Sequence, residues 1–178
     1  MGIKDDFMGA KLLIKISAIV VLVAQLFNWI SFCTTSWITT VVDRVGLWRH
    51  SAPRTLGSTS YDGTGSDSMA ATQAFAIFGF VGLNVGCLLL VLFIFWSSCK
   101  GKSETGLAAG ISLIVSAVTW LIAVSVIAAD FGRIDYQPTF GFSFGFSFGL
   151  AICALILAGV AGVLTILGQL KIGSVSSK

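Results

Sequence analysis

Few residues in this chain of 178 could do chemistry. It contains one histidine, His50, and four cysteines at positions 33, 87, 99 and 153. Catalytic and zinc sites bring several such groups together, but His50 has no cysteine or second histidine near it in the sequence. Neither a nucleophile beside a histidine and an acid nor a glycine-rich phosphate loop occurs. We therefore predict no catalytic residue, no cofactor and no metal site, and a protein that is not an enzyme.

The composition is that of a membrane protein. Charged residues make up 11% of the chain and hydrophobic residues 56%, whereas a soluble domain carries about 25% charged residues. The mean hydropathy is +0.94. The 11 basic and 8 acidic residues are too few to cover a soluble surface. A net charge of +3 also gives no basic footprint for a nucleic-acid partner.

The charges divide the chain into membrane spans. Residues 16–42, 68–99, 105–129 and 136–170 carry no charge, and each run exceeds the roughly 20 residues that a helix needs to cross a bilayer. Continuously apolar runs favour helices over a barrel. We predict an all-α membrane protein, a left-handed bundle of four transmembrane helices in a single domain over 1–178. The expected helices are 11–32, 72–97, 107–129 and 144–168, with outer loops at 33–71 and 130–142.

Lysines and arginines fall on opposite sides of these spans. Because cytoplasmic segments of multi-pass proteins carry the excess of basic residues, the denser lysine side predicts that both termini are cytoplasmic. The lysine side contains Lys4, Lys11, Lys15, Lys100, Lys102, Lys171 and Lys178, and the other side contains Arg44, Arg49, Arg54 and Arg133.

The first outer loop has features of a small antiparallel β-sheet. The β-branched run from Trp37 to Val42 favours a strand, and Gly46-Leu47-Trp48 is interpreted as a second short strand. Asp62-Gly63 is typical of a hairpin turn. The alternative is a disordered polar loop.

Small and polar residues inside the spans predict how the helices pack. Gly141, Gly145 and Gly149 recur every four residues, as do Gly82 and Gly86, and such faces let helices approach closely in lipid. The first face is expected inside the bundle, after a strand-like start that becomes helical by about Phe142; a homo-oligomer contact is the alternative.

Polar side chains in the spans are few. Gln25, Asn28 and Asn84 are expected to form hydrogen bonds between helices, each contributing roughly 1 kcal/mol. Ionisable groups at mid-membrane are absent from the sequence of the spans, which argues against a pump or transporter.

In this four-span layout, Trp37 followed by Gly46-Leu47-Trp48 resembles the claudin superfamily. That group includes the claudins, the peripheral myelin and epithelial membrane proteins, the lens fibre tetraspan protein, and auxiliary subunits of glutamate receptors and calcium channels. Residues 71–75, and Phe142-Ser143-Phe144 after Gly141, are similar to family segments as well. The resemblance implies a plasma-membrane tetraspan protein whose partners are lipid and other membrane proteins.

The chain departs from the family pattern in its first outer loop. Members usually have two cysteines there, and Ser51 stands at the first of these positions. Gln73 stands where members often have arginine before the second span. Cys99 lies beside two lysines at the inner end of the second helix, a position that favours palmitoylation; an unmodified cysteine is the alternative.

Two functions remain after these exclusions. The first is a claudin-like protein of cell–cell contact, junctions or membrane organisation, whose outer-loop sheet meets neighbours in the same or the opposing membrane. The motif of this outer loop is Trp37, Gly46, Leu47 and Trp48. The second is an auxiliary subunit of an ion channel or receptor, which would use the same architecture to bind another protein's helices.

Overall fold

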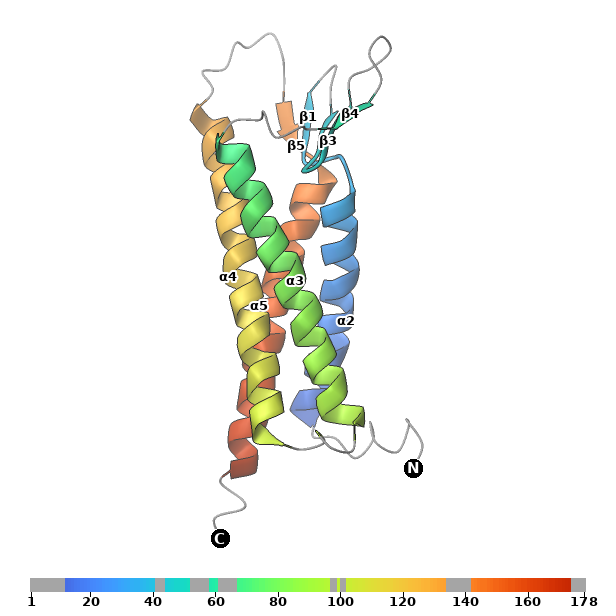
Figure 1. Cartoon of the computed structure of the whole chain (residues 1–178), viewed down its shortest axis with the longest axis vertical. Coiled ribbons are helices and arrows are strands. Elements are labelled where there is room, and N and C mark those ends of the chain that lie inside the picture. Colours follow the sequence, from blue (N-terminus) through green and yellow to red (C-terminus); the bar gives the residue numbers. More distant parts are fainter. Residues whose placement is uncertain are drawn as a thin grey trace.

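The computed structural model describes residues 12–40, 44–51, 58–60, 67–96, 99, 102–133 and 142–173. Its helices are α2 (Leu12–Cys33), α3 (Asp67–Phe95), α4 (Ser103–Arg133) and α5 (Phe146–Gly173). Within these described ranges four helices are long and apolar enough to cross a membrane, so the chain is a multi-pass membrane protein. They form an elongated bundle (Figure 1). We call the end that carries the β-strands the sheet end and the opposite end the terminal end.

Helix α3 begins earlier than the sequence predicts, and α4 extends further than predicted at both ends. α3 begins at Asp67 rather than at residue 72 and contains 29 residues, which corresponds to a length of about 43 Å. α4 runs over 31 residues to Arg133. Since hydropathy locates only the part of a helix inside the hydrocarbon, about 30 Å thick, it misses the polar turns at the ends. α5 begins at Phe146 rather than at 144.

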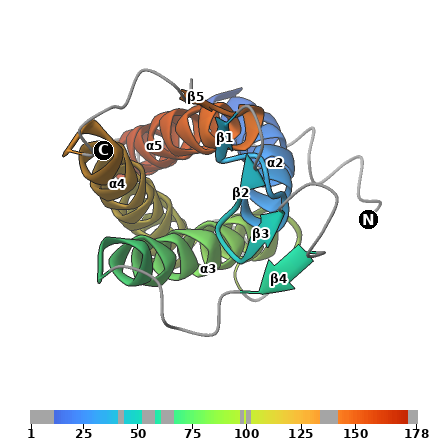
Figure 2. The same ribbon diagram turned by 90° about the horizontal axis from the view of Figure 1, so that it is seen from above.

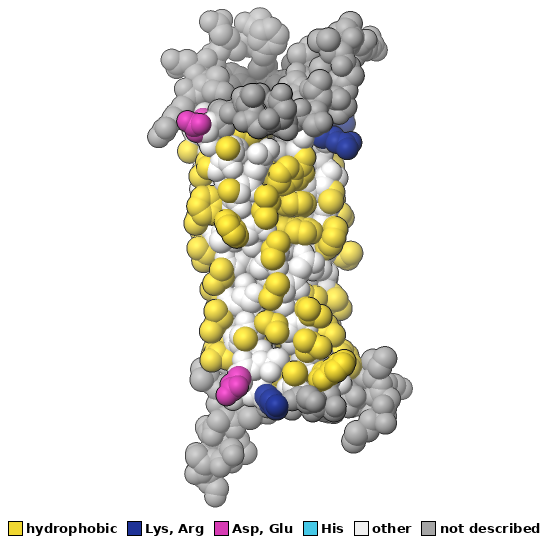
Figure 3. Space-filling view, in the orientation of Figure 1, with side chains coloured by type: hydrophobic (Ala, Val, Ile, Leu, Met, Phe, Trp, Pro, Cys, Tyr) yellow, Lys and Arg dark blue, Asp and Glu magenta, His cyan; other side chains and the backbone are white. Residues whose placement is uncertain are grey.

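Large apolar side chains cover the outside of the bundle (Figure 3). Leu22, Phe78 and Leu88 are each more than half exposed. The interior contains many small groups, among them Ala158, Ala161 and Thr165, which are fully buried, beside a few large side chains such as Leu83 and Trp120. Hydrocarbon solvates leucine as well as another helix does, so the helices associate through close packing of small residues.

The contact between α3 and α4 illustrates this close packing. A Cβ atom at Gly86 would lie 2.7 Å from Leu113 Cδ2, and one at Gly82 would lie 3.1 Å from Ser116 Cβ. The Ser116 hydroxyl donates a hydrogen bond to the carbonyl oxygen of Gly79 at 2.6 Å. A side chain at Gly86 would have to displace the Leu113 side chain, and one at Gly82 would press on Ser116, so these glycines let α4 come this close.

The strands form one antiparallel sheet in the order β4-β3-β2-β1-β5. Figure 2 shows it over the side of the bundle formed by α2. Residues 41–43 and the expected turn at 62–63 lie outside the described residues. The strand bounds are Ile38–Thr40 for β1, Arg44–Val45 for β2, Arg49–Ser51 for β3, Ser58–Ser60 for β4 and Phe142–Phe144 for β5.

Two local predictions differ from the structure. Gly46-Leu47-Trp48 is the connection between β2 and β3, not a strand, because its side chains are used to anchor the sheet to the helices. The segment before α5 stays extended through Phe144, since Thr39 of β1 pairs with Ser143 of β5. The sequence expectation of helix from about Phe142 was wrong for that reason.

The glycines before and in α5 also behave differently from the expectation. Gly145 lies against β1, where a Cβ atom would overlap the carbonyl oxygen of Ser36. Gly149 is exposed, and a Cβ atom there would meet nothing within 4 Å. Gly141 lies outside the described residues. Gly145 and Gly149 therefore do not share one packed helix face. Gly145 is needed because the backbone at Ser36 comes close to it.

Candidate interaction surface at the sheet end

Trp37 joins the sheet to the helical bundle. Its side chain is fully buried, and its Nε1–H donates to the carbonyl oxygen of Ser31 on α2 at 2.8 Å. Its backbone N–H donates to Val45 at 3.0 Å, and its carbonyl oxygen accepts from the N–H of Gly145 at 2.9 Å. One residue therefore connects α2, β2 and the start of α5.

Beneath Trp37 lies a second buried tryptophan, Trp120 of α4. The two rings are stacked with centroids 6.1 Å apart. Trp120 Nε1–H donates to Asn28 Oδ1 at 2.9 Å. A buried indole N–H needs such a partner, and the amide of Asn28 supplies it from α2.

The amides of the spans continue this network across three helices. Asn28 Nδ2 donates to Gln25 Oε1 at 3.3 Å, and Gln25 Nε2 donates to Asn84 Oδ1 of α3 at 2.6 Å. The expectation of polar contacts between helices is thus confirmed. In low-dielectric surroundings a satisfied network of this kind fixes one arrangement of the helices.

The Gly46-Leu47-Trp48 turn reaches down to the ends of α2 and α3. A Cβ atom at Gly46 would lie 2.5 Å from Thr35 Cα, so only glycine fits this close approach of two backbones. Leu47 is fully buried. Trp48 Nε1–H donates to the carbonyl oxygen of Phe32 at 2.9 Å, and the Trp48 and Phe32 rings lie 5.0 Å apart.

Gln73, noted in the sequence as a departure from the family pattern, makes a contact that the sequence did not predict. Its Nε2 donates to the carbonyl oxygen of Leu47 at 2.7 Å. The side chain therefore ties α3 to the turn between β2 and β3. The match over residues 71–75 signalled this region, but only the structure pairs it with Leu47.

The cysteines contribute no cross-link in the described residues. Cys33, Cys87, Cys99 and Cys153 are all free thiols. Cys99 is half-buried at the terminal end, and its N–H donates to the carbonyl oxygen of Trp96 at 2.9 Å. Palmitoylation of Cys99 stays a prediction.

The pairing of β3 with β4 can be tested with an introduced disulfide. Ser51 of β3 lies opposite Ser58 of β4. Replacing both serines by cysteine should let a disulfide form and stabilise the protein by about 2–3 kcal/mol, because it closes a short loop. Free-thiol counting and unfolding with and without reductant measure this. The single variant Ser51→Cys is the control, and a double variant that stays reduced under oxidising conditions would contradict the register.

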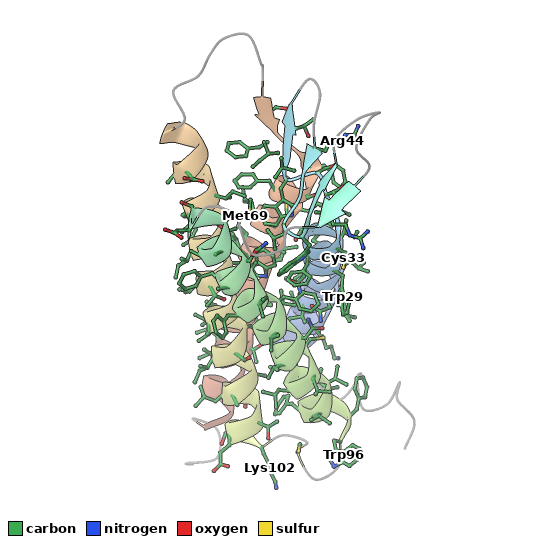
Figure 4. All side chains as sticks on the ribbon, turned by 45° about the horizontal axis from the view of Figure 1, so that its top comes forward. Trp29, Cys33, Arg44, Met69, Trp96 and Lys102 are labelled. Carbon is green, nitrogen blue, oxygen red and sulfur yellow. The ribbon has the colours of Figure 1, made fainter. Side chains whose placement is uncertain are left out.

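The sheet end exposes both charged and aromatic side chains. Arg44 and Arg49 are exposed on β2 and β3, and Figure 4 shows Arg44 at the end opposite to Lys102. Phe144 and Phe146 are 44% and 58% exposed. Among the described residues, no group of three histidine, cysteine or acidic side chains could hold a metal ion. The arrangement offers a surface for binding.

A four-span bundle with an antiparallel sheet tied to it by a tryptophan and a Gly-Leu-Trp turn defines a class of tetraspan membrane protein. The chain matches the model of the PMP-22/EMP/MP20/Claudin family over residues 8–165. The chain belongs to this family, whose members are generally not enzymes. A search of curated proteins found no match.

Proposed function

We propose that this protein acts without catalysis in cell–cell contact, junctions or membrane organisation at the plasma membrane, through the sheet at its sheet end. The observation that supports the proposal is the anchoring of this sheet. Trp37 and Trp48 donate hydrogen bonds into α2, and Gln73 holds the intervening turn from α3. A surface held in place in this way binds a partner without the ordering cost of a flexible loop.

The edges of the sheet offer a way to bind. Among the described residues, β4 and β5 each have a neighbouring strand on one side only. An edge strand presents unpaired backbone groups that another strand can join. The β4 sequence Ser58-Thr59-Ser60 is short and polar, which suits reversible contact better than permanent assembly.

The net charge of the first outer loop does not favour a positively or a negatively charged partner. Arg44, Arg49 and Arg54 balance Asp43, Asp62 and Asp67 in the first outer loop. Recognition by this loop therefore depends on shape and hydrogen bonds. A strong preference for cations or anions along the loop is not expected.

Cell-border imaging tests the contact function. Protein tagged at its C-terminus, expressed in cells that lack relatives, should accumulate at borders between two expressing cells. Trp48→Ala should reduce that enrichment, because the ring and its bond to Phe32 hold the turn. The matched control is Trp96→Ala, at an exposed residue of the terminal end. Uniform surface staining of the unaltered protein would contradict the proposal.

A lateral role as an auxiliary subunit of a channel or receptor is the second candidate. Phe144 and Phe146 support it, since they are exposed where the sheet meets α5 and could contact a neighbouring protein's helix. Affinity purification from native tissue separates the two candidates. A channel or receptor recovered in stoichiometric amount would favour the auxiliary role, and recovery of the protein with itself alone would favour contact.

A further inference from the structure

A first chain of contacts runs from the sheet into the membrane-spanning part of the bundle. It begins at Trp37, whose ring stacks on Trp120 of α4. From Trp120, hydrogen bonds pass to Asn28 and then to Gln25 of α2. Gln25 Nε2 donates to Asn84 Oδ1 of α3 at 2.6 Å. Each link depends on the one before it, because a buried polar group that loses its partner costs free energy.

A second chain of contacts ends at the same residue. It begins at Trp48, in the turn between β2 and β3, whose ring lies 5.0 Å from that of Phe32 on α2. Phe32 stacks on Phe80 of α3, with 4.2 Å between the ring centroids. Asn84 Nδ2 donates to the carbonyl oxygen of Phe80 at 2.8 Å. Both tryptophans of the sheet end are therefore connected to Asn84.

Asn84 marks a change in how α2 and α3 pack, a contact that we call the α2–α3 seam. Toward the sheet end the seam is filled by rings, among them Trp29 at 4.8 Å from Phe80. Toward the terminal end, beginning three residues after Asn84 at Cys87, a groove of about 220 Å³ runs between the two helices. α2 also packs less extensively against α3 than against α5. The terminal half of the seam therefore has room to open or close.

We propose that Asn84 couples the sheet to the α2–α3 seam. Displacement of the Trp37 or Trp48 anchor releases Asn84 from Gln25, and the terminal halves of α2 and α3 then move apart. The contact between α3 and α4 does not take part, because those helices are packed closely at Gly82. The coupling is a property of the chain itself and is independent of what the sheet binds. A partner that shifts the sheet thereby changes the surface that α2 and α3 present to lipid.

Distances between spin labels on the full chain in lipid nanodiscs test the proposal. The labels are introduced by Leu12→Cys on α2 and Trp96→Cys on α3, both at exposed positions of the terminal end, after the four native cysteines are replaced by alanine. Trp48→Phe keeps a ring but removes the hydrogen bond to Phe32. It should raise the ratio of separated to close label pairs about twofold or more. Arg44→Ala, at an exposed residue of β2, should leave the ratio unchanged.

A double-variant comparison tests whether the effect passes through Asn84. Asn84→Leu removes the acceptor of the Gln25 bond and should itself separate the labels, and adding Trp48→Phe should then have no further effect. The matched control is Ser112→Ala, which removes a hydrogen bond from α4 to Gly82 of α3. In that background Trp48→Phe should keep its full effect.

Trp37→Phe, which removes the bond to Ser31, disturbs the first chain of contacts and should separate the labels in the same direction as Trp48→Phe. Circular dichroism shows that each variant is folded, and either tryptophan variant alone suffices for the comparison. Label distances that both variants leave unchanged would overturn the proposal. So would a full effect of Trp48→Phe in the Asn84→Leu background, since the sheet would then act on the seam by another route.

Discussion

Replacing Trp120 by alanine is expected to lower the free energy of unfolding by about 3–5 kcal/mol. The side chain is fully buried, and its loss leaves a cavity beside Trp37, on which it stacks. Asn28 Oδ1 also loses its indole donor, and a buried acceptor without a partner costs about 1–3 kcal/mol within that total. The ring is also closely packed against α3, since a Cβ atom at Gly79 would lie 2.6 Å from Trp120 Cδ1.

Equilibrium unfolding of the purified protein in mixed detergent micelles measures this effect. Trp96→Ala is the matched control, because Trp96 is 59% exposed at the end of α3 and its loss should change stability by about 0.5 kcal/mol. Trp120→Phe keeps an aromatic ring but removes the donor, and its effect should lie between the two. Equal losses at Trp96 and Trp120 would show that the tryptophan–amide network adds no stability.

Gly46→Ala is expected to cost about 1–3 kcal/mol, the range for forcing extra atoms into a packed site. The added Cβ would meet backbone, 2.5 Å from Thr35 Cα and 3.2 Å from the carbonyl oxygen of Thr34. Backbone cannot swing away as a flexible side chain can, so the turn must shift. We expect the bonds from Trp48 to Phe32 and from Gln73 to Leu47 to lengthen together.

The readout for Gly46→Ala is proteolysis of the first outer loop alongside the melting temperature. Gly149→Ala is the control, because an added methyl group there meets nothing within 4 Å and alanine favours the helix by about 0.5–1 kcal/mol. Faster cleavage in Gly46→Ala alone would support the anchoring of the sheet by this turn. Unchanged cleavage would contradict it.

The helices could be predicted from the sequence because charge is excluded from hydrocarbon. The runs without charged residues locate the four spans. The β-branched residues after Trp37 indicate a strand, and the structure has one at Ile38–Thr40. The hydrogen-bonded amides could be expected too, since polar groups in a span need partners. These inferences use local composition only.

The remaining features depend on contacts between distant residues. The pairing of Thr39 with Ser143 joins the first outer loop to the segment before α5, and no local pattern announces it. Gly46 and Gly145 are glycines because another backbone comes close, which spacing along the chain does not reveal. Trp48 has β propensity, but the Leu47 and Trp48 side chains anchor a turn, so the interpretation of this segment as a strand was wrong.

The pairing of β1 with β5 bears on how the chain is made. β1 ends at Thr40 and β5 ends at Phe144, so two further spans, α3 and α4, must be synthesised before β1 can pair with β5. Until then one side of β1 is an unpaired edge. A nascent chain stopped before β5 would keep that edge open, which offers quality-control factors a simple means of telling an incomplete chain from a finished one.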